Sequence, residues 1–167
     1  MQFAIDLWMP ILIGGLAVFV MSALVWTVFP HHKKEWAKFS NEDAVAAAIR
    51  AGNPVPRLYH MPHVAYITIA PNGVPSMGPM MVKSALSSIL IALFLAYVAW
   101  HAIPAGAEYL GVFRIVATVA FMTYAFGSMA DSIWFARPWS SWILQAFDAL
   151  LYGLVLGGIF GWLWPAA

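Results

Sequence analysis

The chain has 167 residues, of which 63% are hydrophobic and only 9% are charged. Soluble domains usually carry about 25% charged residues, so this composition excludes an ordinary soluble protein and predicts an integral membrane protein. The net charge of +1 provides no basic surface for nucleic acid. Because the chain has no cysteine, disulfides, thiolate catalysis and cysteine-ligated metal clusters are also excluded.

Four long apolar segments occupy most of the chain, at residues 3–29, 82–103, 109–129 and 140–164. Each is long enough to cross a hydrocarbon layer ~30 Å thick, which needs roughly 20 apolar residues in a helix. We therefore predict an all-α integral membrane fold, a four-transmembrane-helix antiparallel bundle that forms one membrane domain over residues 1–167. The first segment is expected to be a retained span, because its apolar run is too long for a signal peptide.

The basic residues predict the orientation of these spans. Six of the eight lie between or beside the first two segments: Lys33, Lys34, Lys38, Arg50, Arg57 and Lys83. Since short loops rich in Lys and Arg remain on the cytoplasmic side, residues 30–81 should form a cytoplasmic insertion and both termini should face outward. Tryptophan, which prefers the membrane–water boundary, agrees with this orientation. Four tryptophans fall at the expected outer ends and four near the inner ends: Trp8, Trp100, Trp162 and Trp164, then Trp26, Trp134, Trp139 and Trp142.

The insertion shows signals for short elements. Residues 40–43 form a helix N-cap followed by acidic residues, and the helix should run on through Arg50 to a stop at residues 52–54. Residues 31–39 could form an amphipathic helix at the membrane surface. Residues 64–69 are β-branched and aromatic, and with a turn signal at 71–73 they predict a small hairpin.

Small residues at a spacing of four mark two helix-packing faces. The fourth segment carries Gly153, Gly157 and Gly161, and the second carries Ser84, Ser88, Ala92 and Ala96. Such residues allow close backbone approach where lipid gives no hydrophobic driving force. These faces close the protein's own helix bundle in one interpretation, and in the other they join it to a second copy or to other membrane subunits.

Ionisable residues within the apolar segments are costly and often functional. Asp6, Arg114 and Glu108 fall toward the predicted outer side, where Asp6 or Glu108 is expected to neutralise Arg114. Asp148 lies roughly 12 Å into the fourth segment from its inner end. In a structural role it would bond to a Ser, Thr or Tyr, whereas in a functional role it would carry a proton or ion.

Four of the five histidines gather in the insertion, as His31, His32, His60 and His63. Imidazoles bind zinc, copper, iron or nickel, so these four are candidate metal ligands. Their spacing matches no helical H-E-x-x-H motif, and interfacial or hydrogen-bonding histidines are the alternative. Only His101 lies within a span, which argues against intrinsic haem, and no cofactor is predicted.

Two stretches together resemble a group of small four-span bacterial inner-membrane proteins of unknown function. The first is Phe29-Pro30-His31-His32-Lys33, which leads to Asn41-Glu42-Asp43-Ala44. The second is Asp131-Ser132-Ile133-Trp134-Phe135-Ala136-Arg137-Pro138-Trp139, which leads to Asp148, Tyr152-Gly153 and Phe160-Gly161-Trp162-Leu163-Trp164-Pro165. The resemblance covers most of the chain. It implies four spans and the bacterial inner membrane, and it implies no activity.

No phosphate-binding loop, nucleophile motif or paired carboxylates appear in the sequence, so no catalytic residue is assigned. The sequence favours a non-catalytic membrane protein, an accessory or assembly subunit of a larger inner-membrane complex. One alternative is a small proton- or ion-coupled transporter that uses Asp148. The other is a metal-dependent membrane enzyme that uses the histidines of the insertion.

Overall fold

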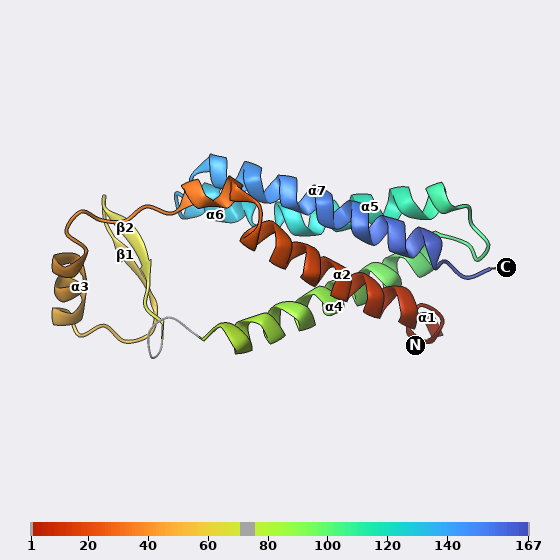
Figure 1. Ribbon diagram of the computed structural model, residues 1–167, viewed down its shortest axis with the longest axis horizontal. Coiled ribbons are helices and arrows are strands. Elements are labelled where there is room, and N and C mark those ends of the chain that lie inside the picture. The colour runs from red at the N-terminus through yellow and green to blue at the C-terminus, as the bar shows by residue number, and fades with distance from the viewer. Residues whose placement is uncertain (1, 71–75, 167) are drawn as a thin grey trace. The chain divides into compact units, whose positions relative to one another are not determined.

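The computed structural model describes residues 2–70 and 76–166, and it is mostly helical, at 72% (Figure 1). The chain divides into two compact units. The helical unit comprises Met1–His32 and Val82–Ala167, and the insertion unit comprises Lys33–Met81.

Among the described residues, four helical stretches are long and apolar enough to cross a membrane, which indicates a multi-pass membrane protein. They are α2 (Trp8–Thr27), α4 (Met77–Ala102), α5 (Tyr109–Phe126) continued by the short α6 (Met129–Trp134), and α7 (Trp139–Trp162). The four predicted segments are therefore confirmed as helices, with ends shifted by a few residues. The second begins five residues earlier than expected, at Met77.

A break at Leu7 separates α2 from the short α1 (Gln2–Asp6). Pro10 lies in the first turn of α2, where a missing N–H costs no internal hydrogen bond. The amides of Leu7 and Ile11 still donate to the carbonyls of Phe3 and Leu7, at 2.9 and 3.0 Å. The first span therefore starts near its proline rather than kinking in its middle.

The glycine face of α7 packs against α5 within the same chain. A Cβ built on Gly157 would lie 2.8 Å from the Cβ of Ala117, and one built on Gly153 would lie 2.8 Å from the Ala117 carbonyl oxygen. A Cβ on Gly161 would meet the ring of Tyr109 at the same distance. Only glycine permits this approach, so the three glycines join α5 to α7, and the face is covered inside the chain.

Gly14 and Gly15 mark where α2 meets two other helices. A Cβ on Gly14 would lie 2.9 Å from the side chain of Leu156 in α7, and one on Gly15 would lie 2.6 Å from the Cα of Ile89 in α4. Three of the four small residues proposed for the second segment, Ser88, Ala92 and Ala96, are buried.

Contacts at the turn between α4 and α5 place the end of the chain beside that turn (Figure 1). The indole N–H of Trp164 donates to the carbonyl of Pro104 at 2.9 Å. The Gly106 amide donates to the carbonyl of Pro165 at the same distance. The α4–α5 turn and the residues that follow α7 thus lie at one end of the helical unit.

The insertion unit contains α3 (Glu42–Ala51) and an antiparallel hairpin of β1 (Leu58–Met61) and β2 (Ala65–Thr68). Helix α3 begins after Asn41 and is capped at Gly52, as predicted. The predicted partner of β2 was wrong, because β2 pairs with the strand before it through a turn at residues 62–64. The Pro71-Asn72-Gly73 turn signal lies outside the described residues.

The segment after α2 also differs from its prediction. It forms a six-residue 3-10 helix, η1 (Pro30–Glu35), rather than an amphipathic helix over residues 31–39. Helices of the 3-10 type hold poorer hydrogen bonds than α-helices and are usually short.

Candidate functional site

Two consecutive histidines on η1 meet a buried aspartate on α7. The Nε2 atom of His31 lies 2.9 Å from Oδ1 of Asp148, and the Nε2 atom of His32 lies 2.7 Å from Oδ2. Both carboxylate oxygens of one side chain are therefore engaged, by residues more than a hundred positions away in the sequence. We call this group the His–Asp–His cluster.

The local structure explains how neighbouring residues reach one carboxylate. Pro30 opens η1 three residues after α2 ends at Thr27. In a 3-10 helix successive side chains diverge by about 120°, so the two rings approach the carboxylate from different directions. The cluster thus fixes the point where the chain leaves the helical unit.

Aromatic rings surround the two imidazoles. The Trp26 indole stacks on His32, with 4.0 Å between ring centroids and 1° between the planes. Phe147, which precedes Asp148 on α7, meets the His31 ring edge-on at 6.0 Å, and Phe29 lies tilted at 6.0 Å. These contacts restrict how far either imidazole can turn.

The cluster is nearly closed to solvent. The side chains of His32 and Asp148 are each only 4% exposed, whereas that of His31 is 20% exposed. A buried carboxylate must be compensated, because removing an ion from water costs several kcal/mol even after the protein relaxes. An ionised carboxylate only accepts hydrogen bonds, so the imidazoles compensate it by donating N–H groups, or a cation does so directly.

The structure changes the sequence interpretation of Asp148. Its partners are the two imidazoles of η1, not the Ser, Thr or Tyr expected for a structural role. One turn farther along α7 lies the buried Tyr152, whose ring packs against Tyr124 with 5.2 Å between centroids, and beyond it Leu156 and Phe160 are fully buried.

The four candidate histidines separate into two pairs. Within residues 2–70 and 76–166, the grouped potential metal ligands are His31, His32 and Asp148, and neither His60 nor His63 joins them. His60 lies on β1 and stacks on Tyr66 with 4.8 Å between ring centroids. His63 occupies the hairpin turn with a φ of 61°. The structure therefore does not bring the four candidate histidines together, although two of them meet Asp148.

The expected partner of Arg114 was also wrong. Across the described residues, neither Asp6 nor Glu108 comes within salt-bridge distance of Arg114. Asp6 instead accepts a hydrogen bond from the Gln2 amide at 2.9 Å. Arg114 is exposed and lies five residues into α5, about 7.5 Å from its start. A long arginine side chain can reach the membrane boundary from that depth without an acidic partner.

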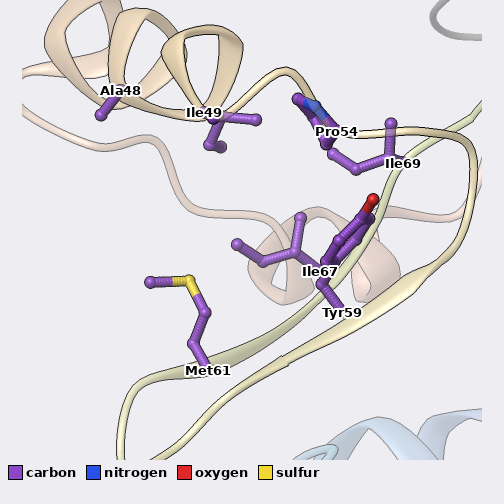
Figure 2. A pocket seen from close by; sticks show the side chains of 8 residues that line it. Ala48, Ile49, Pro54, Tyr59, Met61, Ile67 and Ile69 are labelled. Carbon is purple, nitrogen blue, oxygen red and sulfur yellow. The ribbon is translucent and has the colours of Figure 1, made fainter.

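A second candidate site is an apolar pocket within the insertion unit, between α3 and the hairpin (Figure 2). Its volume is about 290 Å³. It is lined by Ala48, Ile49, Gly52, Pro54, Tyr59, Met61, Ile67 and Ile69. Tyr59 and Ile67 are directly paired across the two strands, so one face of the hairpin forms a wall of the pocket. We call it the α3–hairpin pocket.

No protein-family model matches this chain, and no curated protein or solved structure matches it either. Its function must therefore be argued from its own residues.

Proposed function

We propose that the protein is a non-catalytic integral membrane protein that acts by contact, as an accessory or assembly subunit of a larger complex. The observation that carries this proposal is the α3–hairpin pocket, an open apolar surface outside the four spans. No residue of α3 is buried, and apolar residues such as Leu58 and Val55 are exposed around the hairpin. Contiguous exposed apolar surface of this kind marks sites of interaction.

The occupant that best fits the pocket is a short apolar segment of a partner membrane protein with acidic residues beside it. The insertion unit carries five basic residues against three acidic ones, so its electrostatic field favours an acidic partner. The pocket can accept a few apolar side chains, and the exposed hairpin around it extends the contact. The His–Asp–His cluster supports this role because it anchors the chain just before the insertion unit begins.

The proposed setting is the inner membrane of a bacterium, with the four helices as an antiparallel bundle, the insertion unit in the cytoplasm and both termini outside. The charge distribution supports this orientation. Because the chain has no cysteine, single cysteines introduced at Ala51, Ala105 and Ala166 can each be labelled without background. A membrane-impermeant maleimide applied to intact spheroplasts should label the variants at 105 and 166 but not the variant at 51. The opposite pattern would overturn the orientation.

The contact function is tested by placing a photo-crosslinking residue at Met61, in the pocket, and at Thr68, which does not line it. We expect crosslinking from position 61 to one membrane protein that also co-purifies in mild detergent at a fixed ratio. The complex should be lost in Ile67→Asp and kept in Thr68→Asp. A protein that purifies as a monodisperse monomer or homodimer, with no partner, would overturn the accessory role.

A further inference from the structure

We propose that His31, His32 and Asp148 bind a divalent first-row transition-metal ion of the Zn²⁺ and Fe²⁺ class. This site is independent of the contact function proposed above. It uses residues of the helical unit, whereas the α3–hairpin pocket lies in the insertion unit.

The donor atoms define the class of metal. Two imidazole nitrogens and one carboxylate oxygen suit zinc, iron, cobalt or nickel, whereas magnesium and calcium prefer oxygen ligands alone. The site contains no thiolate, because the chain has no cysteine, so the set is a poor match for Cu⁺. Three protein ligands would leave a fourth coordination position for water or another small ligand, as in open zinc sites.

The three donor groups lie close enough together to reach one ion. The ligand atoms of His31, His32 and Asp148 all lie within 4.8 Å of one another. Ligands placed tetrahedrally at Zn–N and Zn–O distances of about 2.0–2.1 Å are about 3.3 Å apart. The two Nε2–Oδ separations, 2.9 and 2.7 Å to different carboxylate oxygens, are shorter than this by about half an ångström. The ligand atoms span up to 4.8 Å, so the widest pair must close by as much as about 1.5 Å when an ion binds.

The surroundings of the cluster favour a metal as well. The stacked Trp26 ring and the Phe147 edge hold the imidazoles toward the carboxylate, so little side-chain freedom is lost when an ion binds. A dication directly compensates the buried Asp148 carboxylate. The 20% exposure of His31 supplies a route by which the ion can enter.

Metal binding can be measured directly on the full-length protein. The protein is purified in mild detergent through a tag without histidine, stripped with a chelator, and titrated with Co²⁺ and separately with Zn²⁺. We expect one ion per chain and an intense visible Co²⁺ absorption, which indicates a four-coordinate site, and we expect Zn²⁺ to abolish that absorption by displacement.

Three variants and a control locate the site. His31→Gln, His32→Gln and Asp148→Asn should each weaken Co²⁺ binding by more than about a hundredfold, because the loss of an outer-shell partner alone costs tenfold to a hundredfold. The double variant His60→Gln/His63→Gln should bind Co²⁺ as the unaltered protein does. Size-exclusion chromatography and circular dichroism show whether each variant is folded.

Two results would overturn the site. One is a folded wild-type protein that retains no metal after the titration, which would leave the cluster as a hydrogen-bonded clamp only. The other is stoichiometric metal that survives the three substitutions and disappears in the His60/His63 variant. Because wild-type stoichiometry is measured without any substitution, a variant that fails to fold does not weaken the test.

Discussion

Trp26 and His32 stack face to face, with ring centroids 4.0 Å apart and planes parallel to within 1°. Trp26 lies in the last turn of α2 and His32 on η1, so this contact joins the end of a span to the segment that follows it. His32 in turn reaches Asp148 on α7. The stack and the hydrogen bond together hold η1 against the helical unit.

Loss of the Trp26 ring should therefore loosen η1. Aromatic contacts of this kind are worth about 1 kcal/mol beyond area burial, which corresponds to a rise of about fivefold in the population of an opened segment. Lys33 and Lys34 lie on η1, so trypsin reports its opening. Trp26→Ala should be cleaved at these lysines about five times faster than the wild type. Trp162→Ala is the control, since Trp162 is 86% exposed at the end of α7; equal cleavage rates in the two variants would contradict the role of the stack.

The glycines of α7 allow a matched pair of substitutions at neighbouring positions. A Cβ at Gly157 would lie 2.8 Å from Ala117 and 3.0 Å from the Phe113 carbonyl oxygen, whereas the nearest atom to a Cβ at Gly158 is 3.7 Å away. Gly157→Ala should destabilise the protein by about 1–3 kcal/mol, because α5 and α7 must separate. Gly158→Ala should be neutral or stabilising, because alanine has the higher helix propensity. Thermal unfolding in one detergent compares them, and equal midpoints would show that the packing of α5 on α7 is not this close.

Much of the fold follows from the sequence because the four spans and α3 can each be recognised from local information. An apolar segment in lipid must satisfy its own backbone hydrogen bonds, so 109–129 or 140–164 can only be helical. The limits of α3 follow from acidic residues in its first turn and the Gly52 stop. These signals require no knowledge of any other segment.

The candidate site depends on contacts that no local pattern specifies. Hydropathy gives the depth of Asp148 in its span but not the direction it faces, so its meeting with His31 and His32 could not be predicted. The composition of residues 64–69 predicts strand β2, but the turn signal at 71–73 points to a partner after it, whereas β2 is joined to its partner by the turn before it, at residues 62–64. One feature of the sequence does point to the His–Asp–His cluster: Asp148 is an ionisable residue within a span. Such a residue needs a polar or charged partner from another segment.

The contribution of Arg114 to stability should be independent of the charge on Asp6. Since it is exposed and has neither Asp6 nor Glu108 within salt-bridge distance, reversing both charges at positions 6 and 114 should not rescue either single variant. The coupling energy of the double-mutant cycle should be under about 0.5 kcal/mol, the value typical of residues without contact. Thermal unfolding of Asp6→Lys, Arg114→Asp and the double variant measures it. A coupling of several times that size would reveal an ion pair.

Ala136 offers a stabilising substitution. It follows the end of α6 with a φ of 55°, a conformation that an L-residue with a Cβ adopts at a cost of roughly 1–2 kcal/mol. The geometry around it is that of a helix C-cap, because the amides of Phe135 and Arg137 both donate to the Asp131 carbonyl, at 3.0 and 3.2 Å. Ala136→Gly should therefore raise the free energy of unfolding by about 1 kcal/mol.

The same substitution within α6 provides the control for Ala136→Gly. Ala130 is exposed and helical, so Ala130→Gly should lower the free energy of unfolding by about 1 kcal/mol through the poor helix propensity of glycine. Each variant removes one methyl group, and the two positions lie six residues apart. They differ in backbone conformation, which is helical at Ala130 and has a positive φ at Ala136. Denaturant titration in a single detergent gives both values. If Ala136→Gly destabilises the protein as Ala130→Gly does, the positive φ at position 136 is wrong.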